Sequence, residues 1–586
     1  MTLHTFIEEL KRRHVFRVGG VYLVAAWGLI EAVTGVTELF GYGETPGRVV
    51  AVLAIGGFPI ALMLSWFYDI TRQGIVRTAD AAEAAVSGAG QRVLSARATG
   101  MFGLGMLVAL ISIAAVSVMN GGIVARETPG AVADVRALAV LPLAAADAET
   151  SYADALTEEL IRRLSREGQL EVIARTSSFR FRASDEPIPE IARQLRVQAL
   201  LSGTVRRDGE RYVIGIELVD GRTGRVLWSP PSYVVAEADA YQVQERIAHD
   251  LVSALQLSGA TATAGSGTSN TMAAQLYTRG MDRFNERSDA SLRDALGYFT
   301  RATEADPEFA LAFAGLAMTY AALPGAGEFD VVEAFTKGMT AASTAIALDA
   351  TLAEAHAAVG QLVQNYDWAP AASLHSYERA LQFKPSYATA HQGYAEALML
   401  LGRMEEARSA SAEALKLDPL SPAAMNTSAY LQVVSGDYEA ALAALLTEVS
   451  LFPDFRPGHM NLALTAVLAG RLPEIRRALE KYGSGDPELG ALFASVAAGI
   501  ADASRRGEAR RAVLQLEHRI GSPVALWLAA LGDRDGALAA LQRAWDRHAD
   551  PNFLSILVHP LLAPLHADAR YQAILSELGI TLPAQS

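Results

Sequence analysis

The fold is decided by the stretch Pro385–Pro453, PSYATAHQGYAEALMLLGRMEEARSASAEALKLDPLSPAAMNTSAYLQVVSGDYEAALAALLTEVSLFP, in which Pro385, Pro419 and Pro453 stand 34 residues apart. The same spacing leads on to Pro487, and Pro307 and Ala350 occupy the earlier slots. A fixed period of this length predicts a stack of two-helix units, each of which buries its apolar face against its neighbours.

Small residues recur within each period, where two helices must pack closely. Ten positions after the proline slots stand Ala317, Gly360, Ala395, Ala429 and Ala463. The period and this pattern are typical of tetratricopeptide repeats (TPR). We therefore expect an all-α TPR superhelix over residues 271–586, with five clear repeats from about 273 to 455. One or two degenerate repeats are expected after Arg456, where Pro473 interrupts the pattern, and the segment 561–580 resembles the family's C-terminal capping helix.

Such arrays curve into a concave surface that receives a peptide or a helix. On the repeat template the partner-binding groove is predicted to comprise Gln361, Asn365, Gln392, Glu396, Asn426, Tyr430, Asn461 and Leu464, with Gln364, Met399 and Val433 beside them. Lys and Arg are missing from this set, which disfavours a clamp for a carboxylate or phosphorylated tail. The alternative is that these residues only cover the groove or bind the protein's own chain.

Residues 132–256 predict a small α/β domain. The strand RALAVLPL (136–143) is followed by a helix and a second strand, and Asp208-Gly209 favours a hairpin between strands 197–205 and 212–219. A Thr, Ala, Gly and Ser stretch at 257–270 is expected to be a flexible linker. The run Arg175–Ser178 carries hydroxyls beside a cation, but no motif supplies a base, so we interpret it as a turn or a partner-contacting surface.

Residues 1–122 predict a membrane anchor. Three apolar runs, at about 18–40, 49–68 and 99–119, have the roughly 20 residues that a transmembrane helix needs. Arg and Lys flank them so that the positive-inside rule places everything after the third run in the periplasm. The expected location is therefore the bacterial inner membrane, multi-pass, with the lipid bilayer as one partner. Glu31 in the first run is interpreted as a hydrogen-bonded residue between helices, with an ion relay as the alternative.

Two parts of the chain resemble one known family. The segments FIEELKRRHVFRVGGVYLVAAWGLIEAV (6–33) and GFPIALMLSWFYDITRQGI (57–75) look like the membrane head of proteobacterial proteins that carry TolB-like and TPR regions. The segments 152–181 and 200–229 resemble the TolB-like domain of that group. The resemblance implies a multi-domain fold with three transmembrane helices, a small α/β TolB-like domain and an all-α TPR superhelix.

Composition narrows the function. The formal charge of −14 disfavours broad attraction to nucleic acid, and the absence of Cys removes thiolate sites. No phosphate-loop, HExxH or GxSxG motif is present, so we predict no enzyme activity, catalytic residue, metal or cofactor. Relatives with this architecture can carry a cyclase domain or a winged-helix head. We expect neither in this sequence, because no unassigned stretch remains that could form one.

The predicted function is a non-enzymatic, inner-membrane-anchored scaffold that exposes its domains to protein or peptide partners in the cell envelope. The alternative is a transmembrane sensory transducer that passes partner binding to a cytoplasmic protein.

Overall fold

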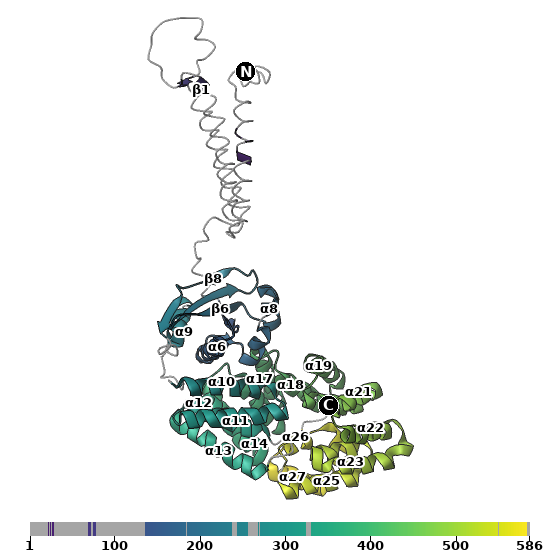
Figure 1. The fold of residues 1–586 in the computed structure, drawn as a ribbon. Helices are drawn as coiled ribbons and strands as arrows, with labels where there is room; N and C mark the ends of the chain where they lie inside the picture. Colours follow the sequence, from purple (N-terminus) through teal and green to yellow (C-terminus); the bar gives the residue numbers. More distant parts are fainter. Residues whose placement is uncertain are drawn as a thin grey trace, which may run out of the picture. The chain divides into compact units, whose positions relative to one another are not determined.

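The computed structural model describes residues 22, 24, 26–27, 68–71, 74–77, 135–182, 184–236, 243–255, 268, 270–323, 330–548 and 550–582. The chain forms two compact units, Met1–Thr128 and Pro129–Ser586. The described part of the first unit contains an antiparallel pair, β1 (Tyr68–Thr71) and β2 (Gly74–Arg77). The second unit holds a small α/β domain and a long array of paired helices (Figure 1).

The predicted fold class and location need correction. Among the described residues, no helix combines the length and the apolar character that a membrane span requires. The longest one, α13 (Val331–Leu348), has 18 residues and includes Glu333 and Lys337, whereas a span needs about 20 residues with few charges. We therefore withdraw the prediction of three transmembrane helices and of a multi-pass inner-membrane location with a periplasmic C-terminal part. Most of the anchor at 1–122, including Glu31, and most of the linker at 257–270 lie outside the described residues.

The α/β domain is built on a mixed sheet with strand order β5-β3-β6-β7-β8. Its elements run β3 (Ala137–Val140), β4 (Ala144–Ala145), α6 (Thr150–Leu164), β5 (Glu171–Val172), α7 (Arg175–Ser178), η1 (Phe179–Phe181), α8 (Ile188–Leu195), β6 (Ala199–Asp208), β7 (Arg211–Asp220), β8 (Val226–Trp228), β9 (Tyr233–Ala236) and α9 (Val243–Ala254). Strand β3 pairs in parallel with β5 and β6, while β6 and β7 form a long antiparallel hairpin. The hairpin pairs Asp208 with Arg211, and Gly209 takes the turn with φ +63°.

Alternation along the strands explains why helices cover both faces of this sheet. Leu138 and Val140 of β3 pack into a core with α6 and α9. The residue between them, Ala139, packs with α8 on the opposite face. Successive side chains of a strand point to opposite faces, so a strand that is buried on both sides reads as a continuous apolar run.

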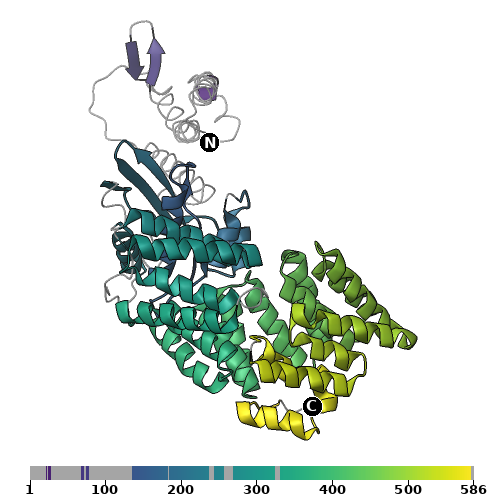
Figure 2. The ribbon, with the colours of Figure 1, turned by 60° about the horizontal axis from the view of Figure 1, so that its bottom comes forward.

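The array consists of helix pairs stacked in chain order (Figure 2). The pairs are α10 (Thr271–Glu286) with α11 (Asp289–Ala305), α12 (Ala310–Ala322) with α13, α14 (Ala353–Tyr366) with α15 (Pro370–Phe383), α16 (Ala388–Leu400) with α17 (Met404–Leu417), α18 (Pro422–Val434) with α19 (Tyr438–Leu451), α20 (Arg456–Leu468) with α21 (Leu472–Tyr482), α22 (Pro487–Ala501) with α23 (Arg506–Ile520), and α24 (Pro523–Ala530) with α25 (Arg534–Arg547). This arrangement confirms the predicted TPR-like helical fold.

The proline slots set where each pair ends. The residue before a slot leaves the helical conformation, with φ between −131° and −145°, at Asp306, Asp349, Lys384, Asp418 and Phe452. A following proline disfavours the helical conformation of the residue before it, which accounts for four of the five. At three of the slots, a histidine of the next helix contacts the backbone of the slot residue. The Nε2 atoms of His356, His391 and His459 lie 2.9 to 3.0 Å from the carbonyl oxygens of these slot residues.

The repeats continue further than the sequence indicated. Three helix pairs follow Arg456 in the described chain, rather than one or two degenerate repeats. Pro473 does not interrupt them, because it lies in the first turn of α21. A proline is tolerated there, since the amides of the first turn have no partner within the helix.

The end of the chain folds back onto the middle of the array. It comprises α26 (Phe553–Leu557), η5 (Pro560–Leu565) and α27 (Ala569–Leu578). Trp368 is buried against Phe553, with ring centroids 4.4 Å apart, and its Nε1 donates to the Asp550 carbonyl oxygen at 3.2 Å. The amide of Thr581 donates to the Leu400 carbonyl oxygen at 3.2 Å. The superhelix is therefore closed by contacts between distant repeats.

Candidate functional site: the inner face of the repeats

The first helices of the pairs pack on one another and form the inner face of the array. The α/β domain docks against the first of them, α10, and against the end of α17 with the turn that follows it. The amide of Ala174 donates to the Leu417 carbonyl oxygen at 2.8 Å, as one strand would to another. The Ser177 hydroxyl donates to Asp418 at 2.5 Å and accepts from the Leu420 amide at 2.8 Å. Ser177 and Asp418 are both buried. These buried polar groups have lost their hydrogen bonds to water, and hydrogen bonds to the repeats replace them. The surface of the α/β domain is therefore complementary to this position on the repeats.

Charged groups reinforce the junction. Arg175 lies between Glu158 of α6, 3.4 Å away, and Asp282 of α10, so one guanidinium joins the two domains. Burial raises the pKa of Glu158 to about 7, although Arg175 opposes the shift. Burial likewise raises the pKa of Asp418 to about 6, partly offset by the Ser177 hydroxyl. Both acids therefore ionise less readily in the docked domain than in water.

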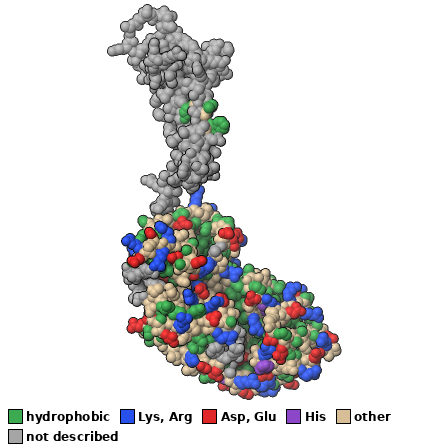
Figure 3. All heavy atoms as spheres, in the orientation of Figure 1, with side chains coloured by type: hydrophobic (Ala, Val, Ile, Leu, Met, Phe, Trp, Pro, Cys, Tyr) green, Lys and Arg blue, Asp and Glu red, His purple; other side chains and the backbone are tan. Residues whose placement is uncertain are grey.

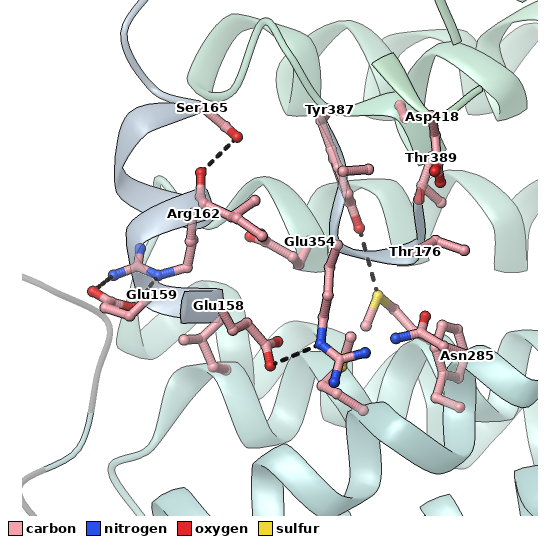
Figure 4. Close-up of a pocket in the computed structure, with 18 of the residues that line it drawn as sticks. Glu158, Glu159, Arg162, Ser165, Thr176, Asn285, Glu354, Tyr387, Thr389 and Asp418 are labelled. Carbon is pink, nitrogen blue, oxygen red and sulfur yellow. Dashed lines mark hydrogen bonds and ion pairs between the residues drawn. The ribbon is translucent and has the colours of Figure 1, made fainter. Parts of the chain in front are cut away.

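A cavity of about 180 Å³ remains between the two domains. Figure 4 shows Glu158, Glu159 and Arg162 on its α6 wall, with Glu354 and Tyr387 on the repeat side. Burial disfavours the charge of Glu354, but Lys384 at 2.9 Å outweighs this and lowers the pKa of Glu354 to about 2. Across the described residues, no group of three or more side chains is arranged to hold a metal ion.

The predicted groove residues divide into two sets, and the first lies on α14 and α16. Gln361 and Asn365 of α14 are partly exposed. Gln392 lines the cavity and donates to Glu396 at 3.1 Å, and Glu396 also accepts from the Thr427 hydroxyl at 2.7 Å. Gln364, beside them, is buried and accepts from the Ser373 hydroxyl at 3.3 Å.

The second set contacts the protein's own chain. Asn426 donates to both carboxylate oxygens of Glu448 at 3.2 Å and accepts from Asn461 at 2.8 Å. The Tyr430 hydroxyl donates to the Ser555 carbonyl oxygen at 2.6 Å, which attaches the C-terminal segment. Leu464 is buried, as are Met399 and Val433. At these positions the inner face is occupied by the chain itself.

Sequence reasoning missed the docking residues. The run Arg175–Ser178 was interpreted as a turn or a partner surface, and it is a short helix that contacts the protein's own repeats. Ser177 and Asp418 are 241 positions apart, so no local spacing connects them. The sequence contains one signal for this docking contact, because the hydroxyl-rich run Arg175–Ser178 comes directly after a buried strand.

Glu448 provides a test of the inner network, because it is fully buried with Asn426 as its partner. Burial raises the pKa of Glu448 to about 8. Its neutral form therefore favours the folded state, and this stability is lost as the pH rises from about 4.5 to 8. Between pH 6 and 8 we expect the whole chain to lose about 2 kcal/mol more unfolding free energy than Glu448→Gln, which cannot ionise. Denaturant titrations at both pH values measure this difference, and equal losses in the two proteins would contradict the assignment.

Comparisons with known proteins come from two parts of the chain. Residues 134–250 match the family model of the HilA/YgeH-like transcriptional regulator, second domain. This description differs from the TolB-like domain that the resemblance predicted for 132–256. The chain is 32% identical over 205 residues to a putative adenylate cyclase 3 of Rhizobium meliloti, covering 33% of this chain and 34% of that protein. It is 26% identical over 307 residues to the transcriptional regulator HilA of Salmonella typhimurium, covering 52% of this chain and 55% of HilA.

The chain thus spans about a third to a half of the length of these relatives. Among solved structures, a thermophilic TPR protein of Thermus thermophilus is 18% identical, with a TM-score of 0.29 over 33% of this chain and 99% of that one. The repeat assignment rests on the helix pairs of this chain and on its 34-residue period.

Proposed function

We propose that this chain is a protein-interaction scaffold of a regulatory system, in which the inner face of the repeats binds protein surfaces. The observation that carries the proposal is the docked α/β domain. Its Ala174 amide and Ser177 hydroxyl already make buried contacts with Leu417 and Asp418. A repeat array that already binds one protein surface through backbone and hydroxyl groups has the chemistry to bind another.

The part of the inner face proposed for a partner protein or peptide is the set Gln361, Asn365, Gln392 and Glu396. These side chains are partly exposed, unlike Leu464 further along. Amide side chains pair well with an extended peptide backbone, because they offer a donor and an acceptor together. The positions beyond them hold the chain's own C-terminal segment, so a partner there would have to displace it.

Regulation is the proposed process because HilA is named as a transcriptional regulator and the α/β domain matches the second domain of that family. Figure 3 shows acidic and basic side chains interspersed over the visible face of residues 135–582. Such a mixed surface favours a protein partner over the phosphate backbone of a nucleic acid. The match to the putative cyclase covers a third of that protein, so its named activity is not part of the proposal.

Photo-crosslinking in the whole chain tests the scaffold proposal. A photoreactive residue at Gln361, on the inner helix α14, is expected to give discrete adducts with a partner protein in cells of the source organism. The same residue at Thr340, exposed on the second helix α13, serves as the matched position outside the inner face. Equal adducts from the two positions would contradict the proposal.

A charge reversal at the junction sharpens this test. Arg175→Glu places a third negative charge beside Glu158 and Asp282, so we expect the α/β domain to leave the repeats. A photoreactive residue at Gln392, which lines the cavity beside that domain, should then give severalfold more adducts. Arg193→Glu is the matched control, because Arg193 is 72% exposed and pairs with Glu190 of the same helix, α8. An adduct yield that is the same in the wild type and both variants would show that docking does not regulate access.

A further inference from the structure

The cavity between the domains is lined by α6 and α7 of the α/β domain and by helices of the repeats. Its wall on α10 is apolar, because Tyr277, Met281 and Phe284 recur there at the spacing of helical turns. Leu311 and Met318 of α12 also line the cavity. Neither domain encloses this space alone, so the cavity exists only while the two are docked.

Three buried polar atoms of the lining have no hydrogen-bond partner among the described residues. They are Oε2 of Glu158, Nε of Arg175 and Nδ2 of Asn285. Oε2 and Nε lie 3.4 Å apart, and their side chains are 14% and 11% exposed. Nη1 of Arg162 is also unsatisfied, but Figure 4 shows Arg162 with Glu159 at the other end of the drawn site from Asn285. Buried polar groups are costly to leave unsatisfied, so three of them together indicate a missing partner.

One ion pair brings Asn285 to the other two residues. The guanidinium of Arg175 also pairs with Asp282 of α10. Asn285 lies three positions after Asp282, on the neighbouring turn of the same side of this helix. Figure 4 shows the amide of Asn285 turned toward the dashed ion pair of Glu158. One acceptor and two donors therefore face the same part of the cavity.

The charges of the lining disfavour an ionic ligand. Four acids and four bases line the cavity, namely Glu158, Glu159, Glu354 and Asp418, and Arg162, Arg175, Arg287 and Lys384. An anion at the three unsatisfied atoms would meet the carboxylate of Glu158, and a cation would meet the guanidinium of Arg175. Neither would find an excess of opposite charge to offset its lost hydration. A neutral group suits this place best.

A hydroxyl group is the complement of the three atoms. It offers one O–H donor and two lone pairs on a single oxygen, whereas Glu158 needs one donor and the two nitrogens need one acceptor each. An ether or a carbonyl oxygen would leave Glu158 unsatisfied, because it has no hydrogen to donate. A water molecule has a second O–H, for which this group of atoms has no acceptor.

Size and the apolar wall restrict the rest of the molecule. A water molecule needs about 10 to 15 Å³ of such space, so 180 Å³ accommodates on the order of ten non-hydrogen atoms. The side chains of Tyr277, Met281 and Phe284 favour an aromatic body, because rings pack well on other rings and on thioether sulfur.

We propose that the cavity binds a small neutral aromatic alcohol or phenol, whose hydroxyl donates to Glu158 and accepts from Arg175 and Asn285 while its ring packs on the apolar wall of α10. The three residues come from both domains, so the ligand favours the docked arrangement. This inference does not depend on the proposed scaffold function, because it rests on the unsatisfied atoms of the cavity.

The test uses the whole chain with phenol, benzyl alcohol and 2-phenylethanol. Each is compared with the hydrocarbon that carries a methyl group in place of the hydroxyl, namely toluene, ethylbenzene and propylbenzene. We expect at least one hydroxyl compound to bind, measured by calorimetry and by a higher unfolding midpoint. Its hydrocarbon should bind at least about tenfold more weakly, because it leaves the three polar atoms of the cavity without partners.

Asn285→Ala removes one of the two donors, so the ratio between the affinities for the hydroxyl compound and its hydrocarbon should fall about three- to tenfold. The affinity for the hydrocarbon itself should not fall, because the apolar wall is unchanged. Without ligand, the unfolding midpoint of this variant should stay equal or rise, since an unsatisfied buried donor is removed. Glu158→Gln should also reduce the ratio, because the hydroxyl loses a charged acceptor.

Glu286→Gln is the matched control, because Glu286 follows Asn285 on α10, is 51% exposed and pairs with Arg283. It should keep both the affinity and the ratio of the wild type. Should one cavity variant unfold, the ratio in the other decides. Failure of all three hydroxyl compounds to bind, equal binding of the hydrocarbons, or an unchanged ratio in the folded cavity variants would overturn the proposal and leave ordered water as the occupant.

Discussion

Replacing Trp368 by alanine is expected to destabilise the repeat array by about 3 to 5 kcal/mol, the usual cost of removing a buried indole. Trp368 is 2% exposed and stacks on Phe553 and Trp545, and its Nε1 reaches the Asp550 carbonyl oxygen. The cavity would open between α15 and the C-terminal helices. We expect α26 to detach first, because Trp368 is one of its attachments to the middle repeats.

The measurement is a denaturant titration of the whole chain combined with limited proteolysis. Trp368→Phe is the matched variant, because it keeps an aromatic ring against Phe553 and loses the Nε1 hydrogen bond. We expect this loss to lower the free energy of unfolding by about 1 kcal/mol. The further loss in Trp368→Ala then measures the packing of the ring. Cleavage within 545–582 should accelerate in Trp368→Ala. If the C-terminal segment stayed protected while stability fell, the closure of the superhelix would not depend on this residue.

Replacing Gly393 by alanine is expected to cost about 3 kcal/mol, at the upper end for overpacking a core. A Cβ at Gly393 would lie 2.4 Å from the ring of Tyr377. This ring cannot move away, because Gly360 approaches it as well, where a Cβ would lie 2.8 Å from the ring, and Tyr377 is 2% exposed. The tyrosine is held between two inner helices whose contact requires glycine at both positions.

The matched control is Gly297→Ala in α11, where an added Cβ meets nothing within 4 Å. Alanine has the higher helix propensity, so this variant should gain up to about 1 kcal/mol. Unfolding midpoints of the two variants therefore should move in opposite directions. A stable Gly393→Ala protein would show that the inner helices can separate at this point, contrary to the close packing described.

The two predictions bear on function through the same inner face. Gly393 lies one residue from Gln392, which lines the interdomain cavity, and Trp368 lies three residues from the proposed partner residue Asn365. Spacing between the inner helices therefore sets both the cavity and the surface offered to a partner. A variant that changes this spacing should alter partner binding as well as stability.

The helical part of the fold was accessible from the sequence by itself, because a repeat is a local pattern. Proline slots 34 residues apart and small residues ten positions after them define where helices end and where they cross, and both depend on neighbours in the chain. Pro473 shows the limit of this reasoning. A proline within an apparent helix suggests an interruption, and only the observed start of α21 shows that it occupies a harmless first-turn position.

Burial and docking were decided by the tertiary structure alone. Tyr430 occupies a groove position of the repeat template, and nothing local in the sequence indicates that Ser555, 125 positions away, is its partner. Ser177 and Asp418 meet only because the α/β domain folds against the fourth repeat. Contacts between residues hundreds of positions apart depend on the curvature of the whole stack, which sums small rotations over many repeats and leaves no periodic trace in the sequence.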